Sequence, residues 1–359
     1  MTLGPLMLDI AGTELTDEDR HRLSHPLVGG VILFTRNYCD AAQLAALTAE
    51  IHALKPAPLL IAVDYEGGRV QRFRKGFTRI PPMRTFGEIW NSHPQRAREL
   101  ARETGFVLAS ELRAHGVDFS FGPVLDLDYG ASSVIGDRAF HADPKVVFEL
   151  GQAVMLGMKD AGMAACGKHF PGHGFVVADS HVAVPLDERT LDEISEADLE
   201  PFRLMAEAGL AAMMPALVIY PKVDPNPAAF SPIWLKKILR ERLGFDGAIF
   251  SDDLCMDAAS VAGGMVERVS AALGAGCDMA LVCNRSDLAD EVLSKLQIDW
   301  PAQARARLAR MHGRPHPLSM TVLRESARYV NALHHISGLG QESADLNLQI
   351  DPTDYCARS

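Results

Sequence analysis

The chain has 359 residues, of which 48% are hydrophobic and 23% are charged, so it can bury a large core in one big domain or two. Its formal charge of -11 at pH 7 is spread along the chain without a block of Lys or Arg, which argues against a nucleic-acid partner. The longest uncharged apolar stretch, residues 208–221, is too short to cross a bilayer and contains Pro215. We therefore expect a soluble globular protein with no membrane span.

Short apolar runs rich in strand-forming residues alternate along the chain with stretches of helical apolar spacing. The predicted strands cover residues 6–10, 30–34, 59–63, 117–121, 164–169, 211–218, 248–250 and 279–282. The predicted helices cover residues 40–54, 95–115, 144–161, 188–208, 232–242 and 266–275. Asp40 fits an N-cap, as does Ser231 with Pro232 at the first helical position. Because this alternation indicates parallel strands, the eight units predict an α/β fold, a single (β/α)8 TIM barrel.

A doubly wound open sheet is the competing architecture, but no G-x-G-x-x-G follows the first strand and no Walker loop is present. Residues 64–91 form a long stretch rich in Gly, Pro and Arg, which we expect to wrap the barrel mouth. After residue 337 the sequence becomes polar and aperiodic. We therefore assign residues 1–337 to one barrel domain and residues 338–359 to a loosely ordered polar C-terminal tail.

The N-terminus and the cysteines both indicate a cytoplasmic protein. The first residues carry no basic leader and no small-residue cleavage site, so we expect no signal peptide. The six cysteines show no paired C-x-x-C spacing, and most lie in apolar surroundings, as free thiols usually do. The sequence carries no signal for an oligomeric state.

Polar residues stand at the C-terminal ends of the predicted strands, and in a parallel barrel these ends converge on one face. They are Asp9, Asp64, Asp126, Asp128, Lys168, His169, Asp252 and Asp253. A strand-end Asp commonly caps the next helix or closes a turn, and we keep that interpretation for Asp9 and Asp128. Asp64 is followed by Arg69 and Arg72 in a glycine-containing loop. A carboxylate and a guanidinium together suit sugar hydroxyls, whereas the plain alternative is a surface ion pair.

The stretch KHFPGHG, residues 168–174, is the densest group of reactive side chains, and DSH follows it. Three histidines and a carboxylate could bind a metal ion, since both are zinc ligands. Alternatively, Asp179 orients His181 and tunes it as a general acid/base near neutral pH. In the plain alternative, each histidine only hydrogen-bonds the loop backbone. The glycines favour the acid/base interpretation, because a mobile catalytic loop after the fifth strand suits an acid that must enter and leave.

Five motifs, taken in order, resemble the single-domain β-N-acetylglucosaminidases of glycoside hydrolase family 3. They are IAVDYEGGRVQRF, IGDRAF, KHFPGHG with the later DSH, MMPA and IFSDDLCM. The resemblance covers residues 5–283, most of the chain. It implies a (β/α)8 barrel that needs no cofactor and no metal. It also implies an exo-acting enzyme of peptidoglycan recycling, which removes terminal N-acetylglucosamine from cell-wall muropeptides with retention of configuration.

Carried over motif by motif, the resemblance implies individual roles. Asp252, the first carboxylate of SDD, would be the nucleophile that forms a covalent glycosyl-enzyme. His181, paired with Asp179, would be the acid/base, because a histidine with a pKa near roughly 6.5 can serve both roles at cytoplasmic pH. The sugar would be held by Asp64, Arg72, Arg138, Lys168 and His169.

Two positions depart from the family pattern. Leu217 stands where a histidine usually follows MMPA, and Asp137 replaces the asparagine of IGNRAF. Leu217 removes a polar group from a strand end, and Asp137 could alter how Arg138 is held. Neither change touches the nucleophile or the acid/base pair.

Two other hypotheses stay open at this point. One is a metal-dependent barrel hydrolase that uses His169, His173 and Asp252 as ligands. The other is a catalytically silent sugar-binding barrel. Chelator treatment tests the first, and turnover of a chromogenic glycoside tests the second.

Overall fold

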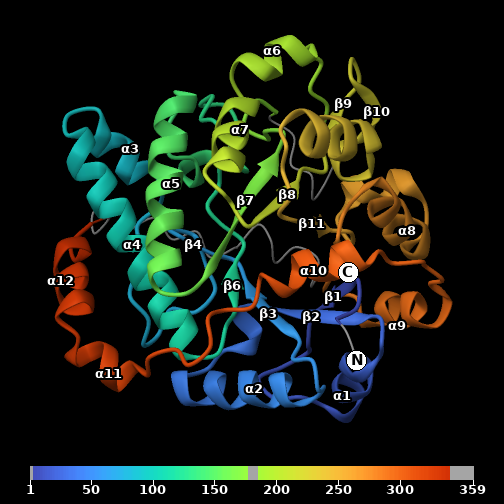
Figure 1. Cartoon of the computed structure of the whole chain (residues 1–359), viewed down its shortest axis with the longest axis horizontal. Helices are drawn as coiled ribbons and strands as arrows, with labels where there is room; N and C mark the ends of the chain where they lie inside the picture. The colour runs from blue at the N-terminus through green and yellow to red at the C-terminus, as the bar shows by residue number, and fades with distance from the viewer. Residues whose placement is uncertain (1–2, 177–184, 340–359) are drawn as a thin grey trace.

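The computed structural model describes residues 3–176 and 185–339, and eight parallel strands within these ranges close into a barrel (Figure 1). Around the barrel the strands follow the order β1, β12, β11, β8, β7, β6, β3 and β2. Their bounds are β1 Leu6–Leu8, β2 Val28–Leu33, β3 Leu60–Val63, β6 Phe119–Ser120, β7 Ala164–Phe170, β8 Ala212–Pro215, β11 Ala248–Asp253 and β12 Met279–Val282. Each predicted strand is present, and the prediction of a (β/α)8 barrel is confirmed.

Helices surround the barrel and connect each strand to the next (Figure 1). In chain order they are α1 Asp17–Ser24, α2 Ala41–Ala53, α3 Arg84–Trp90, α4 Pro94–Ala114, α5 Pro144–Asp160, α6 Leu191–Glu196, α7 Leu199–Glu207, the π-helix η4 Ile233–Arg242, α8 Met265–Ala275 and α9 Ser286–Lys295. Three more helices follow: α10 Ala302–Ala309, α11 Met320–Glu325 and α12 Ala327–Ile336. The last of these packs against α4 on the outside of the ring.

The long loops all follow the C-terminal ends of barrel strands. They contain the hairpins β4 Tyr65–Gly67 with β5 Val70–Gln71 and β9 Ile219–Tyr220 with β10 Asp224–Pro227. They also contain the 3-10 turns η1 Thr35–Asn37, η2 Gly136–Arg138, η3 Ala228–Phe230 and η5 Asp257–Ala262. The predicted 64–91 stretch is thus a hairpin followed by α3. This end of the barrel is the usual place for a barrel enzyme's active site.

The predicted helix starts hold, with one shift. The Asp40 side chain accepts a hydrogen bond from the backbone N–H of Gln43 and caps α2 as predicted. The Ser231 hydroxyl accepts from the backbone N–H of Trp234 at 3.1 Å, although the regular helix η4 begins at Ile233, after Pro232. A side-chain cap and a helix boundary commonly differ by a residue in this way.

The predicted helix 188–208 is wrong as one element, because the structure divides it into α6 and α7. Asp198 lies at the break, where its buried side chain accepts hydrogen bonds from Arg189 at 2.6 Å and from the Tyr129 hydroxyl at 2.8 Å. Tyr129 belongs to the loop after β6, whereas Arg189 lies just before α6, inside the range predicted as helix. Tertiary packing therefore overrides the local helical pattern here.

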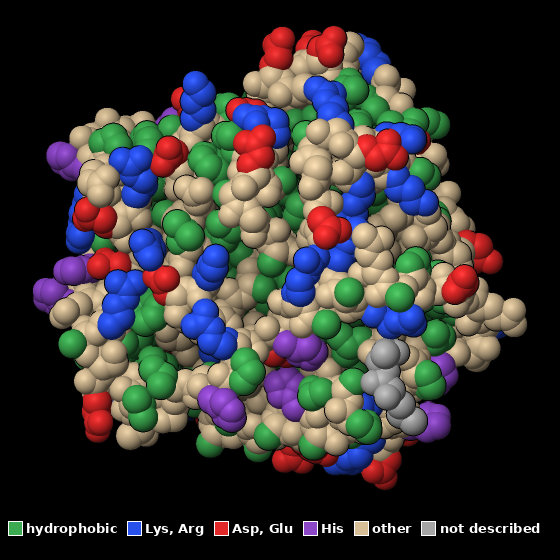
Figure 2. All heavy atoms as spheres, in the orientation of Figure 1, with side chains coloured by type: hydrophobic (Ala, Val, Ile, Leu, Met, Phe, Trp, Pro, Cys, Tyr) green, Lys and Arg blue, Asp and Glu red, His purple; other side chains and the backbone are tan. Residues whose placement is uncertain are grey.

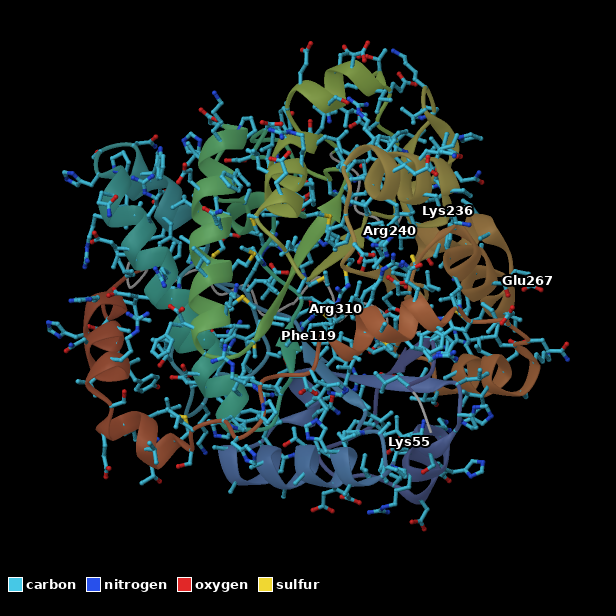
Figure 3. The ribbon with its side chains drawn as sticks, in the orientation of Figure 1. Lys55, Phe119, Lys236, Arg240, Glu267 and Arg310 are labelled. Carbon is cyan, nitrogen blue, oxygen red and sulfur yellow. The ribbon has the colours of Figure 1, made fainter. Side chains whose placement is uncertain are left out.

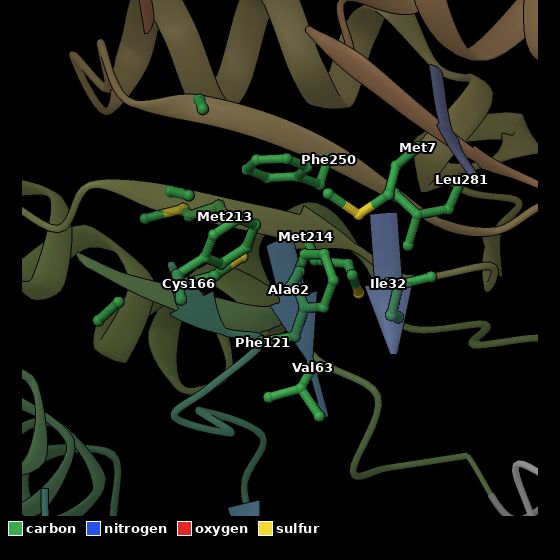
Figure 4. Packing of buried hydrophobic residues seen from close by; sticks show 14 of the residues in the cluster. Met7, Ile32, Ala62, Val63, Phe121, Cys166, Met213, Met214, Phe250 and Leu281 are labelled. Carbon is green, nitrogen blue, oxygen red and sulfur yellow. The ribbon is translucent and has the colours of Figure 1, made fainter. Parts of the chain in front are cut away.

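Apolar side chains fill the inside of the barrel (Figure 4). The rings of Phe119, Phe121 and Phe250 form a triangle with centroids 5.1 to 5.5 Å apart. Met7 and Leu281 lie against each other on the neighbouring strands β1 and β12 (Figure 4). Burying each such side chain stabilises the fold by about 1.5–3 kcal/mol. The packed interior forms a rigid floor beneath the C-terminal loops.

At the opposite, N-terminal end of the barrel, a half-buried lysine ties two connections together. Phe119 lies at the centre of Figure 3, and Lys55 lies at its lower edge between α1 and α2. The Lys55 ammonium donates to the carbonyl oxygens of His25 and Val28 at 2.6 and 2.7 Å, and burial lowers its pKa to about 8. Lys55 thus joins the end of α2 to the start of β2, a structural role.

Lys and Arg side chains are interspersed with Asp and Glu over the face seen in Figure 2. Across the described ranges, none of the helices combines the length and the apolar character needed to span a bilayer.

Candidate active site

A pocket opens at the C-terminal end of the barrel, where most of the strands contribute to its lining. The space between the lining atoms is about 750 Å³, part of it continuous with solvent, which is in the range of small-molecule sites. The lining residues are Ile32, Phe34, Asp64, Glu66, Val70, Phe121, Val134, Arg138, Lys168, His169, His173, Met214, Asp252, Asp253, Met256, Leu281, Cys283 and Asn284. Of the predicted strand-end side chains, Asp64, Lys168, His169, Asp252 and Asp253 line this pocket, whereas Asp9, Asp126 and Asp128 do not.

One side of the pocket is a chain of alternating charges from β3, β7 and the loop after β6. The Lys168 ammonium lies 2.7 Å from an oxygen of Asp64 and 2.7 Å from an oxygen of Glu66. The second partner of Glu66 is Arg138, whose guanidinium donates two hydrogen bonds of 2.8 Å to its two oxygens. This bidentate geometry fixes the plane of the guanidinium. Two acids and two bases therefore hold one another in place beside the pocket.

The charges in this cluster stay ionised because they are paired. Burial alone would raise the pKa of Asp64, but the charges of Lys168 and Arg72 outweigh it and hold the pKa below its usual value. For Glu66 burial is likewise outweighed by Arg138 and Lys168, so its pKa is well below normal. Burial would lower the pKa of Lys168, but the two carboxylates raise it. The cluster thus presents fixed donors and acceptors to a ligand.

The carboxylate of Asp126 holds the loop that carries His169 and His173 in place. One of its oxygens lies 2.7 Å from Nδ1 of His169, and the other accepts the backbone N–H groups of His169 and His173 at 3.1 and 2.7 Å. Asp126 is fully buried, so this carboxylate is a fixed anchor. The bond to Nδ1 turns the opposite edge of the His169 ring, with Nε2, away from Asp126. Burial, followed by the nearby His169, lowers the pKa of His173 to about 4, so its imidazole is neutral at pH 7.

Two adjacent carboxylates end β11 and face the other side of the pocket. An oxygen of Asp252 accepts the backbone N–H of Asp253 at 2.8 Å. Asp253 in turn accepts the backbone N–H groups of Cys255 and Cys283 at 3.0 and 3.2 Å, which ties β11 to the end of β12. Burial, with a contribution from the charge of Asp252, raises the pKa of Asp253 to about 7. The two neighbours therefore differ in their environment: the Asp252 side chain accepts one adjacent backbone N–H, whereas the Asp253 side chain accepts two, one of them from the end of β12.

Most of the predicted sugar-binding residues line this one pocket: Asp64, Arg138, Lys168 and His169. Arg72 differs, because it is fully buried behind Asp64, with the two side chains 3.5 Å apart and its guanidinium over the ring of Phe34. The predicted nucleophile Asp252 also lines the pocket. The predicted acid/base pair, His181 and Asp179, lies outside the described residues.

Asp128 and Asp9 were both interpreted as caps or turn residues. Asp128 accepts the backbone N–H of Gly130 at 2.9 Å, as a turn residue does. Asp9 neither caps α1, which is capped by Thr16, nor closes a local turn. Its oxygen instead accepts the backbone N–H of Asn284, 275 residues away, and pairs with Arg36. The cap interpretation of Asp9 is wrong, because β1 lies beside β12 in the closed barrel and the strand ends meet.

The two departures from the family pattern leave the cluster intact. A carboxylate oxygen of Asp137 lies 3.5 Å from Nε of Arg69. Arg138 pairs instead with Glu66, so Asp137 is not its partner. Arg69 itself donates to the carbonyl oxygens of Ser133 and Val134, a structural contact between two loops. Leu217 is buried in the apolar core, where a hydrocarbon side chain is well accommodated.

Sequence reasoning did not assign Glu66 to the site, and it placed Asp126 at the barrel mouth without giving it a role. The only signal for Glu66 was its place two residues after Asp64, and its partner Arg138 is 72 residues away. At least one glycine of the 168–174 loop is needed for close packing. A Cβ at Gly174 would lie 1.9 Å from the carbonyl oxygen of Leu127, so this position needs glycine for close packing.

Within the described parts of the chain, no group of three or more His, Cys, Asp or Glu side chains is arranged to hold a metal ion. His173 packs its ring against that of His169 at a centroid distance of 6.0 Å, with an interplanar angle of 66°. These histidines are thus arranged edge to face and do not converge their nitrogen atoms on one point.

Comparison with known proteins gives one family. Residues 6–311 match the family described as "Glycosyl hydrolase family 3 N terminal domain". The chain is 78% identical to a protein named beta-hexosaminidase from Thiobacillus denitrificans, with all of both chains covered. It is 61% identical to a beta-hexosaminidase from Methylobacillus flagellatus, covering 96% of this chain and 99% of the relative.

Solved structures agree in fold over nearly the whole chain. NagZ from Neisseria gonorrhoeae in complex with N-trifluoroacetyl-D-glucosamine superposes with a TM-score of 0.91 at 48% identity, covering 95% of this chain and 99% of that one. The same Neisseria protein in complex with zinc ion gives a TM-score of 0.89 at 47% identity, with the same coverage.

Proposed function

The chain belongs to glycosyl hydrolase family 3, and we propose that it is a retaining exo-β-N-acetylglucosaminidase that releases GlcNAc from muropeptide fragments. A β-N-acetylhexosaminidase activity is supported by the names of relatives that match it from end to end. The observation that carries the proposal is the pocket itself. It brings the carboxylate of Asp252 to face a fixed cluster of sugar-binding groups at one barrel mouth.

Asp252 is the proposed nucleophile. Its carboxylate lines the pocket, and the backbone N–H of Asp253 holds one of its oxygens. That bond orients the group and leaves the second oxygen for attack on the anomeric carbon. A covalent glycosyl-enzyme then forms as the leaving group departs, and water releases the sugar with retained configuration.

His181, with Asp179, is the proposed acid/base on sequence grounds. It would donate a proton to the leaving oxygen and then take one from the attacking water. The remaining site residues are proposed to hold the sugar. Lys168 and Arg138 supply hydrogen-bond donors, and Asp64 supplies acceptors. Arg72 supports Asp64 from behind, because it lies beneath that carboxylate.

A muropeptide substrate and a cytoplasmic location belong to the same proposal. The resemblance to the peptidoglycan-recycling enzymes supports the substrate. The cysteines within the described ranges are all free thiols, which is typical of a reducing compartment. Release of GlcNAc from GlcNAc-1,6-anhydro-MurNAc-peptide, compared with chitobiose, tests the substrate class. Faster turnover of chitobiose would contradict it.

Labelling with a 2-fluoro or 5-fluoro N-acetylglucosaminyl fluoride, followed by peptide mass mapping, tests the mechanism. The label is expected on Asp252, and Asp252→Ala is expected to fold normally while losing nearly all turnover. Asp257→Ala is the matched control, since Asp257 is an exposed carboxylate on the same loop outside the pocket. Attachment of the label to any other residue would sink the assignment.

A further inference from the structure

Asn284 stands out at the rim of the pocket because of its backbone. It follows β12, lines the pocket, and has a φ of 62°, in the left-handed region that residues with a side chain seldom adopt. Asn tolerates this conformation better than most residues, but it remains less favourable than a right-handed or extended backbone. A non-glycine residue held in this conformation beside an active site is a reason to look for a function.

Two charged residues from neighbouring strand ends hold Asn284. Its backbone N–H donates to the carboxylate of Asp9 at 2.9 Å, and its side-chain Oδ1 accepts from Nη1 of Arg36 at 2.9 Å. Arg36 and Asp9 also form an ion pair with each other. The guanidinium of Arg36 lies 4.6 Å from the ring centre of Phe34, which restrains it further. Asn284, which follows β12, is thus held by residues that follow β1 and β2: Asp9 holds its backbone and Arg36 holds its side chain.

The contact with Arg36 determines the orientation of the Asn284 side-chain amide. A guanidinium has only N–H donors, so the amide atom facing Arg36 must be the oxygen. The Nδ2 group therefore points away from Arg36, and among the described residues it has no hydrogen-bond partner. Asn284 is partly exposed, and the pocket is the space it lines. A donor with a fixed direction and no protein partner is suited to a ligand.

The surroundings indicate what kind of ligand atom it meets. The lining from β2, β12 and the loop after β11 includes the apolar residues Ile32, Phe34, Met256 and Leu281. It also includes Asp253, whose carboxyl accepts the backbone N–H of Cys283, the residue before Asn284. A neutral amide N–H in such a pocket matches an uncharged oxygen acceptor.

We infer that Asn284 is a further substrate-binding residue, whose Nδ2 donates a hydrogen bond to an oxygen of the sugar held in the pocket. Asp9 and Arg36 are positioning residues that act through it. The inference rests on the proposed placement of the substrate opposite Asp252. The sugar offers two kinds of acceptor, a ring hydroxyl and the acetamido carbonyl, and the test separates them.

Asn284→Gly is the first test, because glycine accepts the positive φ and only the amide is lost. Loss of one hydrogen bond to a neutral group is expected to lower kcat/KM for 4-nitrophenyl N-acetyl-β-glucosaminide about 3- to 10-fold. His316→Gly is the matched control, since His316 has a φ of 56° and lies outside the pocket lining. It should keep the parent kcat/KM. If both variants stay within twofold of the parent, the inference is wrong.

A second variant distinguishes loss of the Nδ2 donor from a structural defect caused by Asn284→Gly. Asn284→Asp keeps the oxygen that faces Arg36 and tolerates the left-handed backbone, but it has no N–H to donate. Its kcat/KM should fall at least as far as that of Asn284→Gly. A normal rate in Asn284→Asp, with a loss only in Asn284→Gly, would assign a purely structural role and overturn the inference.

Substrate comparison identifies the acceptor. If only the N-acetylglucosaminide loses rate, and the 4-nitrophenyl β-glucoside does not, the acceptor is the acetamido carbonyl. Equal losses for both substrates identify a ring hydroxyl. Calorimetric binding of free GlcNAc separates this inference from the proposed mechanism. Labelling at Asp252 with unchanged GlcNAc affinity in Asn284→Gly refutes the inference alone, whereas labelling elsewhere refutes the mechanism.

Discussion

Asp253→Asn is expected to make the protein more stable at neutral pH. Burial first, and then the charge of Asp252, raise the pKa of Asp253 from 3.8 to about 7, against the lowering effect of the backbone N–H groups of Cys255 and Cys283. The folded protein therefore keeps a proton near pH 6 that the unfolded chain has released. Asparagine retains the oxygen that accepts those two N–H groups and carries no ionisable group.

The sign and size follow from proton linkage. Below pH 3.8 the carboxyl is protonated in both states, and its full contribution to stability is present. As pH rises towards 7, the unfolded state binds fewer protons than the folded state, so the free energy of unfolding falls. At about 1.4 kcal/mol for each pKa unit, the difference between 3.8 and 7 amounts to about 4 kcal/mol. This loss is complete above pH 7.

Urea unfolding of parent and variant at pH 4.5, 6, 7 and 8 measures the effect directly. The difference in unfolding free energy should be small at pH 4.5 and should rise towards about 4 kcal/mol in favour of the variant at pH 8. Asp257→Asn, on the same loop, is the control for removal of a carboxylate at an exposed site. A difference that does not change with pH would show that Asp253 is ionised in the folded protein and would refute the reasoning.

Three other outcomes are expected. Glu66→Gln should destabilise the protein by about 3–5 kcal/mol, because Arg138 and Lys168 lose a buried charged partner; an unchanged urea midpoint would contradict this. His181→Ala should slow substrates with poor leaving groups by roughly 100- to 10,000-fold and aryl glycosides far less. Equal losses in both would make His181 a binding residue. Dialysis against EDTA should leave the rate unchanged, whereas a loss restored by zinc would favour the metal-dependent hydrolase.

The barrel was predictable because its signal is local. A buried parallel strand is a short apolar run, and its period and its end can be read from a few neighbouring residues. Asp64, Lys168 and Asp252 stand directly at such ends, so topology alone predicted that they meet. The same reasoning failed for the helix over 188–208, because the side chain of Asp198 is held by Tyr129 from a distant loop and by Arg189, which lies before α6.

The supporting residues of the site were not predictable, since their partners are far away in sequence. Glu66 pairs with Arg138 across 72 residues, and Asp9 bonds Asn284 across 275 residues. Each pair joins two loops, and loop conformation has no periodic signature in sequence. A strand-end Asp that supports a neighbouring loop is indistinguishable in sequence from one that caps a helix.

The charge balance of the pocket argues for an uncharged ligand. Besides Asp253, four carboxyl groups lie in it or directly behind it, and three basic side chains face them. They are Asp64, Glu66, Asp126 and Asp252, with Lys168, Arg72 and Arg138. A phosphate or carboxylate ligand would meet no surplus of positive charge, whereas sugar hydroxyls can both donate and accept. Burial, with the charge of Asp252, raises the pKa of Asp253, so this carboxyl adds less negative charge to the pocket than an ordinary Asp would.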